Sequence, residues 1–301
     1  MTITQVGFIG LGNMGSPMAA HLVDAGFALT VSDAAPEVTR RFVAEHPTAI
    51  AAAGRQSFAT VRALILMLPT SGIVEDVLER ENVAGALPPG CLVIDMSSSE
   101  PLRTRGLAAR LRARGLSMID APVSGGVRGA RAARLSVLVG GSETDLTRAT
   151  PLLAAMAATI IRVGDIGSGH AAKALNNLVS AATMSITVEA LVVAEAFGIT
   201  ADTMTRVLNS SSGRSNTSEN KLAQFMTSGT FDSGFSLRLM AKDVGLALDL
   251  ARALDRPVEV ADDVAGQWRR IAGEVGQATD HTQMYTLLGA TEPESPAGQA
   301  R

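Results

Sequence analysis

Apolar and polar positions in the first half of the chain fall into short apolar runs separated by longer segments with helical spacing. Short apolar runs bounded by turn residues are typical of buried strands, and apolar positions three to four residues apart are typical of helices. We predict strands at 6–9, 28–32, 63–68, 91–95, 135–140 and 159–164, with helices over 16–25 and 143–157. Strands that alternate with helices predict a parallel sheet covered by helices.

In the second half the pattern is helical throughout. From His170 to Phe197 there is no Pro or Gly, and Gly198 supplies a residue that tolerates the backbone of a helix end. This run is apolar nearly all the way round, so we expect a core helix long enough to cross two domains. Shorter helices are predicted at 200–210, 217–227, 236–254, 257–276 and 280–289, before a tail with the composition of a frayed end.

The first predicted strand leads into a glycine-rich turn that opens a helix. In a turn of the form GxGxxG, the first two glycines allow a tight bend and close approach to a pyrophosphate. The third lets helix and strand pack, and the helix N-terminus faces the anion. We therefore predict a dinucleotide site made by Gly10, Leu11, Gly12, Asn13, Met14 and Gly15.

The second predicted strand ends in Asp33, about 20 residues beyond the first glycine. A carboxylate there is placed to accept hydrogen bonds from the adenosine ribose hydroxyls, and it would repel a 2′-phosphate. We therefore predict NAD, and not NADP, as the cofactor. The alternative is that Asp33 starts the helix that follows Pro36.

Small polar residues follow the next two predicted strands. Open α/β sheets bind ligands beyond the carboxyl ends of their strands, so we expect Leu68, Pro69 and Ser98 to lie against the cofactor. Loop hydroxyls also cap helices, and Ser71 and Ser99 both precede helical patterns. For these two serines we favour the capping role.

Composition and charge narrow the class of protein. Hydrophobic residues make up 47% of the chain and aromatic residues 3%, which fits a soluble protein packed from Ala, Val and Leu. A net charge of −3 gives no field that attracts nucleic acid or an anionic membrane, and we expect neither partner. The long apolar run carries Lys173 and Glu189, which hydrocarbon would penalise. A single cysteine, Cys91, and no leader pattern at the amino terminus favour a cytoplasmic location.

A lysine at the start of the long apolar helix calls for an explanation. Lys173 and Asn177 are one turn apart and share a face of that helix. Lys173 could snorkel, with its stem buried and its ammonium in water. Alternatively, desolvation lowers the pKa of the amine so that it can exchange a proton with a substrate, which Asn177 orients. The helix alone leaves both readings open.

Three further polar features stand near the predicted site. Ser124, Gly125 and Gly126 follow a strand and could form a nest of backbone N–H groups for a substrate carboxylate, or an ordinary turn. The loop 211–216 could supply donors to a substrate or be a solvated connection. The pair Lys242 and Asp243 on a predicted helix could be functional or a simple surface ion pair.

Four of these motifs, in this order, make the sequence similar to the β-hydroxyacid dehydrogenase family over nearly the whole chain. The matching segments are 7–15, 120–126, 167–177 and the pair Lys242-Asp243. The resemblance implies that Lys173 is the catalytic acid/base and Asn177 its helper. It also implies that Ser124, Gly125 and Gly126 hold the substrate, that Phe235 and Asp243 contact it from the helical half, and that Lys242 reaches the cofactor.

The chain departs from the family at two places. Ala133-Arg134 stands where the family usually has Gly-Thr, which puts the shape of that turn in doubt. Ser97-Ser98 replaces the usual Ser-Thr and keeps the hydroxyl. The patterns and the resemblance together imply a Rossmann-type α/β domain over 1–164 and an all-α substrate and oligomerisation domain over 165–301, joined by a long interdomain helix.

The activity implied by the resemblance is reversible, NAD-dependent oxidation of a small 3-hydroxy acid, such as 3-hydroxyisobutyrate, to its semialdehyde. Tartronate semialdehyde reduction is the alternative within the family. An imine reductase, whose relatives usually replace the lysine, and a non-catalytic NAD-binding scaffold are alternatives outside it. We expect no metal ion, and a homodimer or homotetramer because the helical half is rich in apolar surface. Arg128 and Arg214 hint weakly at a second anionic group on the substrate.

Overall fold

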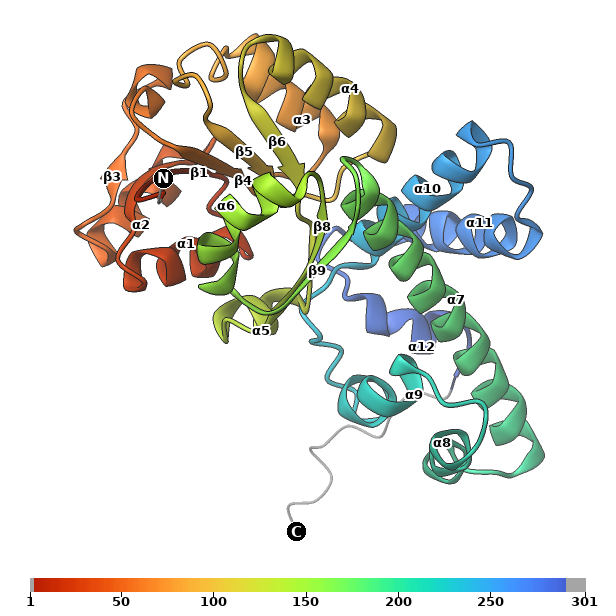
Figure 1. The fold of residues 1–301 in the computed structure, drawn as a ribbon. Helices are drawn as coiled ribbons and strands as arrows, with labels where there is room; N and C mark the ends of the chain where they lie inside the picture. Colours follow the sequence, from red (N-terminus) through yellow and green to blue (C-terminus); the bar gives the residue numbers. More distant parts are fainter. Residues whose placement is uncertain (1–2, 291–301) are drawn as a thin grey trace. The chain divides into compact units, whose positions relative to one another are not determined.

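The structure, a computed structural model, describes residues 3–290, and the chain divides into two compact units (Figure 1). Unit 1, Met1–Lys173, is an α/β unit built on one sheet, and unit 2, Ala174–Arg301, is helical in its described part. Helix α7, Ser168–Phe197, contributes its first residues to unit 1 and the rest to unit 2. The predicted fold class is confirmed, while the predicted frayed tail lies outside the described residues.

The sheet of unit 1 has the strand order β3-β2-β1-β4-β5-β6-β8-β7, with β9 paired to β8. Its strands are β1 Gln5–Ile9, β2 Ala28–Ser32, β3 Ile50–Ala51, β4 Ala63–Leu66, β5 Leu92–Asp95, β6 Ser117–Asp120, β7 Val123–Ser124, β8 Leu135–Gly140 and β9 Ala157–Gly164. The pairs from β3 through β6 are parallel, whereas β8 runs antiparallel to β6 and β7. All predicted strands are therefore confirmed.

Helices cover both faces of this sheet. They are α1 Gly15–Asp24, α2 Pro36–Glu45, α3 Ser71–Glu75, α4 Pro101–Ala113, α5 Gly126–Arg131 and α6 Glu143–Ala154, with a 3₁₀ turn at Arg55–Phe58 and a π turn at Asp76–Arg80. Successive strand residues point to opposite faces, so Ile65 packs in the core under α1 and α6 while Leu64 and Leu66 pack in the core under α3 and α4. Each such buried aliphatic side chain contributes about 1.5–3 kcal/mol.

The chain reverses its direction across the sheet next to β1. After β1 it builds β2 and β3 on one side, and it then returns to place β4 on the other side. The loops that follow β1 and β4 leave the sheet at this switch point, where doubly wound sheets bind their ligands. The glycine turn and the segment Met67–Pro69 are therefore neighbours, as the close approach of Gly10 to the carbonyl of Met67 demonstrates.

Unit 2 contains only helices in its described part. These are α7, α8 Ala201–Ser210, α9 Asn216–Asn220, a π turn at Leu222–Met226, α10 Leu237–Ala253, α11 Glu259–Glu274, a 3₁₀ turn at His281–Gln283 and α12 Met284–Leu287. The core is centred on Trp268, which is fully buried and donates its indole N–H to Ser185 Oγ at 3.0 Å. The predicted helix at 217–227 breaks at Lys221, and the one predicted at 280–289 is only two short turns.

Helix α7 is not the all-round core helix that its composition predicts. One face is buried in the core of unit 2, through Ala181, Met184, Val188 and Leu191. The opposite face exposes Leu175, Val179, Ile186, Val193 and Phe197. The helix is long and apolar enough to cross a membrane, with a mean hydropathy of 1.6 over an 18-residue stretch. However, 44% of that stretch is buried within the protein itself. Its buried face identifies it as a helix of a protein core.

The predicted capping roles of Ser71 and Ser99 are wrong. Thr70 caps α3 instead, because its side chain accepts the N–H of Ile73. Ser71 Oγ accepts the N–H of Glu100 at 2.7 Å, and Ser99 Oγ donates to Asp95 at 3.0 Å. The Ser71 hydroxyl thus connects two neighbouring loops, whereas the Ser99 hydroxyl makes a local contact with the end of β5, four residues earlier.

The turn at Ala133 has the strained shape that the sequence put in doubt. Ala133 follows the end of α5 with a φ of 51°, in the left-handed region where glycine is favoured. We predict that Ala133→Gly stabilises unit 1 by about 0.5–1 kcal/mol, because relief of the Cβ clash exceeds the added entropy of the unfolded chain. Urea unfolding followed by far-UV circular dichroism measures the change.

The matched control for this prediction is Ala132→Gly. Ala132 precedes Ala133 and has a φ of −89°, which suits any residue. The control should destabilise the protein, since it adds unfolded-state entropy without relieving strain. Equal effects of the two substitutions would contradict the strain at Ala133.

Candidate active site

The three glycines of the first turn have three different surroundings. Gly10 has a φ of 100°, and a Cβ there would collide with the carbonyl oxygen of Met67. A Cβ on Gly15 would collide with the carbonyl oxygen of Gly10, so this glycine lets α1 start against β1. At Gly12 no heavy atom lies within 4 Å of the added Cβ, so no packing within the protein demands a glycine there. Open space beside a helix N-terminus fits the pyrophosphate of a dinucleotide.

Asp33 ties the end of β2 to this glycine turn. Its Oδ2 accepts the N–H of Leu11 at 2.7 Å, and its Oδ1 accepts the N–H of Ala35 at 2.9 Å. The N-cap of α2 is Ala35, so Asp33 does not itself cap the helix. Each carboxylate oxygen can accept a second hydrogen bond, and the arrangement therefore fits a ribose diol beside the turn.

The loops after β4 and β5 are linked to each other. The N–H of Leu68 donates to Ser97 Oγ at 3.0 Å, and the N–H of Ser97 donates to Asp95 Oδ1 at 3.0 Å. Leu68 and Ser98 are half-buried and Pro69 is exposed, so a ligand at the switch point can reach all three. These loops and the glycine turn are the parts of unit 1 that could hold NAD.

The segment Ser124–Gly126 has the backbone of a nest. Gly125 has a φ of 126° and Gly126 a φ of 61°, and both are conformations that L side chains rarely adopt. No heavy atom lies within 4 Å of a Cβ placed on Gly126, while Ser124 is half-buried on β7. The segment could therefore present successive N–H groups and one hydroxyl to an anion.

The start of α7 is fixed by a carboxylate from the sheet. Asp120, at the end of β6, accepts the N–H of Gly167 at 2.6 Å and the N–H of His170 at 2.7 Å. It thus satisfies donors of the first turn of α7 in the way that an N-cap does, from a distant part of the chain. Burial raises the pKa of Asp120 above its usual range, against the charge of His170 and the two N–H donors, which lower it.

Two glycines allow this close approach between α7 and the sheet. A Cβ on Gly140 of β8 would collide with Asp120 Oδ1 and would lie 2.8 Å from the N of Gly169. A Cβ on Gly169 would collide with the carbonyl oxygen of Leu138. Gly140 and Gly169 are therefore needed so that α7 can pack against the sheet.

Lys173 lies one turn after this anchored start and is only 8% exposed. Burial to this degree disfavours the alternative in which its ammonium snorkels into water. Asn177, one further turn along, is 5% exposed and donates its amide Nδ2 to Asp243 Oδ2 at 2.7 Å. Asp243 thereby fixes the amide of Asn177. The side-chain amide of Asn176 in turn donates to Oδ1 of Asn177 at 3.3 Å.

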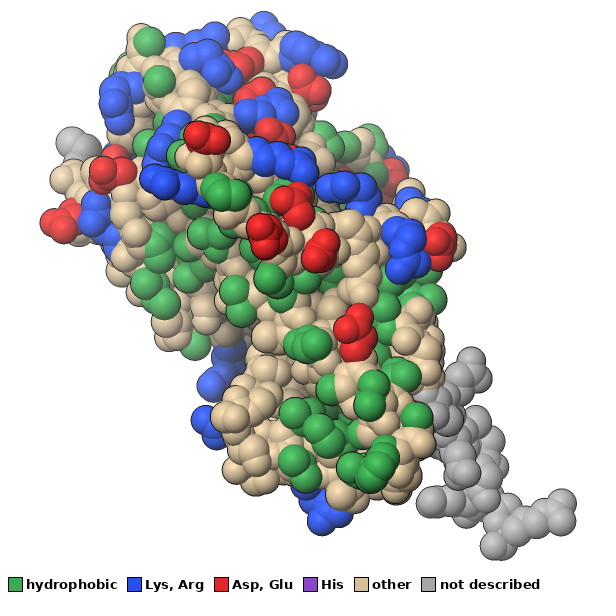
Figure 2. All heavy atoms as spheres, turned by 90° about the vertical axis from the view of Figure 1, so that its right-hand side faces the viewer, with side chains coloured by type: hydrophobic (Ala, Val, Ile, Leu, Met, Phe, Trp, Pro, Cys, Tyr) green, Lys and Arg blue, Asp and Glu red, His purple; other side chains and the backbone are tan. Residues whose placement is uncertain are grey.

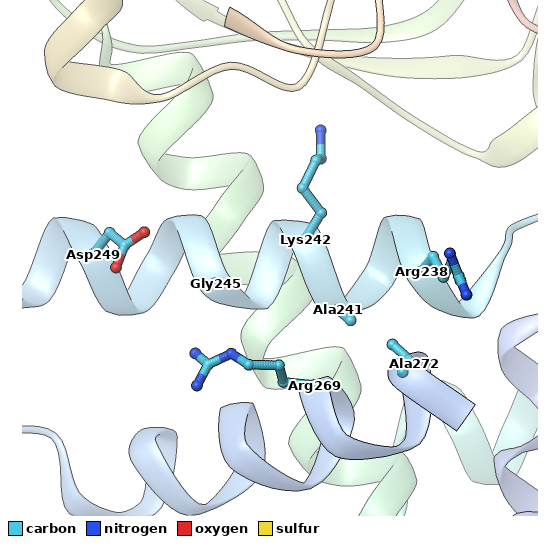
Figure 3. Close-up of a pocket in the computed structure, with 8 residues that line it drawn as sticks. Arg238, Ala241, Lys242, Gly245, Asp249, Arg269 and Ala272 are labelled. Atoms are coloured by element: carbon cyan, nitrogen blue, oxygen red, sulfur yellow. The ribbon is translucent and has the colours of Figure 1, made fainter. Parts of the chain in front are cut away.

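Lys242 and Asp243 do not form a simple surface pair. Asp243 is 2% exposed, and its Oδ1 lies 3.3 Å from Lys242 Nζ. Lys242 projects from α10 on the side away from α11 (Figure 3). An open pocket of about 450 Å³ runs along these two helices, lined by Arg238, Ala241, Lys242, Gly245, Asp249, Arg269, Ala272 and Gly273. Three of its lining residues are cationic and one is acidic.

Phe235 is held by a buried cluster within unit 2. The carboxylate of Asp280 accepts the N–H groups of Gly234 and Phe235 and the hydroxyl of Ser233. Although burial acts to raise the pKa of Asp280, hydrogen bonds from His281, Thr282 and Ser233 together hold it well below its usual range. His281 also stacks edge-on against Phe235 at 5.7 Å. Ionised Asp280 therefore fixes the backbone at Phe235, while His281 contacts its ring.

The polar side chains of the loop 211–216 make contacts that stabilise the start of α9. Ser215 caps α9 in a reciprocal pair with Ser218, and Arg214 lies 3.5 Å from Glu219. Of the two alternatives left open for this loop, these contacts support a structural connection and give no support to a source of substrate donors.

Sequence reasoning missed the residues that position the site. These are Asp120 as the cap of α7, His170 and Thr104 beneath it, and Asp280 behind Phe235. The sequence does carry a signal for Asp120, because Asp95 and Asp120 each end an apolar strand. The structure pairs these two residues in register on adjacent strands. A charged residue at the end of a buried strand needs a partner, and only the fold supplies it.

Two family models cover almost all of the described chain. Residues 5–164 match the NAD binding domain of 6-phosphogluconate dehydrogenase. Residues 167–288 match the model described as the NAD-binding domain of NADP-dependent 3-hydroxyisobutyrate dehydrogenase.

Individual relatives agree with these matches. The chain is 38% identical over 256 residues to 2-(hydroxymethyl)glutarate dehydrogenase of Eubacterium barkeri, covering 84% of each chain. It is 38% identical over 256 residues to the NAD-dependent L-serine dehydrogenase of Pseudomonas aeruginosa, covering 83% of this chain and 86% of the relative. The solved structure of Mycobacterium tuberculosis 3-hydroxyisobutyrate dehydrogenase with L-serine superposes with a TM-score of 0.88 at 34% identity, covering 96% of this chain and 100% of that one.

Proposed function

Because the chain belongs to the β-hydroxyacid dehydrogenase family and is an NAD-dependent hydroxyacid dehydrogenase, we propose that it reversibly oxidises a small 3-hydroxy acid to its semialdehyde. The observation that carries the proposal is the buried pair Lys173 and Asn177 on the anchored start of α7. The relatives' names support the substrate class, since 2-(hydroxymethyl)glutarate and L-serine both carry a hydroxyl on the carbon β to a carboxylate.

Lys173 is the acid/base of this reaction. NAD, when bound, supplies the acceptor for the hydride that leaves the carbinol carbon. As that C–H bond breaks, neutral Nζ of Lys173 takes the hydroxyl proton, and in the reverse direction its ammonium returns the proton to the oxygen. Asn177, whose amide is oriented by Asp243, holds the reacting oxygen in reach of the lysine.

The remaining predicted contacts keep their roles in this proposal. Ser124, Gly125 and Gly126 bind the substrate carboxylate through a hydroxyl and backbone N–H groups. Phe235 and Asp243 are proposed as substrate contacts, and Lys242 as a cofactor contact.

The substrate that we favour is 3-hydroxyisobutyrate or a close analogue. The competing substrate is tartronate semialdehyde, reduced in the opposite direction. A panel of 3-hydroxy acids that includes L-serine and 2-(hydroxymethyl)glutarate, assayed with NAD, separates these candidates by kcat/KM. We propose a cytoplasmic location for this activity.

Replacement of the lysine tests the mechanism. Lys173→Met should lower kcat by at least about 100-fold, because the loss of a general acid or base typically costs 100- to 10,000-fold. NAD affinity, measured by calorimetry, should change little. Retention of kcat within tenfold of the wild type would refute the role of Lys173.

The neighbouring asparagines provide a matched pair for the same assay. Asn177 is buried and Asn176 is exposed on the same helix. Asn177→Ala should lower kcat by about tenfold, as expected for one lost hydrogen bond, while Asn176→Ala should leave it near the wild-type value.

Asp33 should make the enzyme prefer NAD to NADP. Asp33→Ala should lower the NAD:NADP ratio of kcat/KM by about 10- to 100-fold, through lost charge-assisted hydrogen bonds and relief of the repulsion of a 2′-phosphate. Asp33→Asn, which keeps an acceptor for the N–H of Leu11, isolates the contribution of charge. Equal kcat/KM of the wild type with both cofactors would count against the assignment.

A homodimer or homotetramer is proposed from the exposed face of α7. Its five exposed apolar side chains, Leu175, Val179, Ile186, Val193 and Phe197, fall within about 40° of one another around the helix at 100° per residue. Figure 2 shows hydrophobic side chains gathered on unit 2 in the lower part of the view. A continuous apolar stripe of this kind typically marks a protein interface.

Light scattering tests this assembly. The wild type should have the mass of two or four chains, and Ile186→Glu should shift it toward one chain. Asn176→Glu, on the same helix but about a quarter turn away from the stripe, should not change the mass. A monomer mass for the wild type at micromolar concentration would exclude the proposal.

A further inference from the structure

The imidazole of His170 is buried in a polar network entirely within unit 1. His170 is 1% exposed, and its Nε2 lies 3.1 Å from the carbonyl oxygen of Ser97. Its Nδ1 lies 2.9 Å from Thr104 Oγ1 on α4. Since a carbonyl oxygen only accepts, Nε2 is the donor to Ser97. The ring therefore bridges the loop after β5 and helix α4.

Two buried carboxylates flank the same ring. Asp95 Oδ2 lies 3.8 Å from Nε2, and Asp120 Oδ2 lies 3.8 Å from Nδ1. Each carboxylate is also held by other donors: Ser97 and Ser99 donate to Asp95, while the N–H groups of Gly167 and His170 donate to Asp120. A ring fixed from four directions has one orientation available to it.

This network joins the two parts of unit 1 that the reaction must hold in register. At one end, Ser97 Oγ accepts the N–H of Leu68, so the loops after β4 and β5 move together. At the other end, His170 belongs to the first turn of α7 and lies one turn before Lys173. Any shift of those loops relative to the lysine would break the contact of His170 with Ser97.

We propose that His170 is a positioning residue that keeps Lys173 in register with the cofactor loops through its contacts with Ser97 and Thr104. The inference rests on the proposed role of Lys173 as the acid/base. His170 does not touch the substrate in this account, and it acts only through the lysine.

Substitution of His170 tests this role by its effect on kcat. His170→Leu, which removes both ring contacts, should lower kcat by about 30- to 100-fold, since small misplacements of a reacting group are costly. NAD affinity, measured by calorimetry, should stay within threefold. His170→Gln can keep a donor to the Ser97 carbonyl and should restore kcat to within fivefold of the wild type. A kcat of His170→Leu within threefold of the wild type would overturn the proposal, as would a loss of NAD affinity as large as the loss of kcat.

A double-mutant cycle identifies the route of the effect. In the Lys173→Met background, His170→Leu should change the residual rate by less than threefold, because the group that it positions is already gone. A full 30-fold loss in that background would show that His170 acts elsewhere.

A second pair of variants covers the case in which His170→Leu does not fold. Thr104→Val removes the hydroxyl that bonds Nδ1 while keeping the shape of the side chain, and Thr104→Ser keeps the hydroxyl. Thr104→Val should lower kcat at least fivefold and Thr104→Ser should not. Equal rates for the two would contradict the proposal.

Hydrogen exchange separates failure of this inference from failure of the proposed function. In Thr104→Val or His170→Leu, amide exchange across residues 167–173 should speed up at least tenfold while the strands of the sheet stay protected. Unchanged exchange would overturn the positioning role. If Lys173→Met kept the wild-type rate, the proposed function would fail although the exchange result stood.

Discussion

The carboxylate of Asp120 is the constraint on which the lysine end of α7 depends. It binds two N–H groups of the first turn, and glycines at 140 and 169 leave room for that contact. A buried carboxylate without donors would be costly, and a helix N-terminus without an acceptor would be equally so. Each group therefore stabilises the other, and the pair sets the position from which the helix runs into unit 2.

The same logic separates the glycines of the chain into two kinds. Gly10, Gly15, Gly140 and Gly169 are needed because the protein itself occupies the space of a side chain. At Gly12 and Gly126 that space is open. Glycines of the second kind lie where the backbone can approach an anionic ligand, which is consistent with the cofactor and substrate roles proposed for these turns.

Much of this fold could be predicted because its signals are local. The glycine turn, the alternating strands and helices and the long helix are each encoded in a short window of sequence. Asp120 and His170 are 50 residues apart, and His170 and Ser97 are 73 apart, so no window contains these contacts. The capping role predicted for Ser71 is wrong for the same reason, since its partner Glu100 comes from a neighbouring loop. Ser99 instead bonds Asp95, four residues earlier, so a local contact replaces the predicted cap. Composition also could not reveal that α7 buries one apolar face and exposes the other.

The single tryptophan of the sequence lies in the middle of unit 2, at Trp268. Intrinsic tryptophan emission therefore reports the integrity of the helical unit and is blind to the sheet that carries the nucleotide turn. A thermal melt followed at that wavelength would assign full stability to a protein whose unit 1 had already unfolded. If the two units melt separately, the temperature read from this chromophore belongs to only one of them.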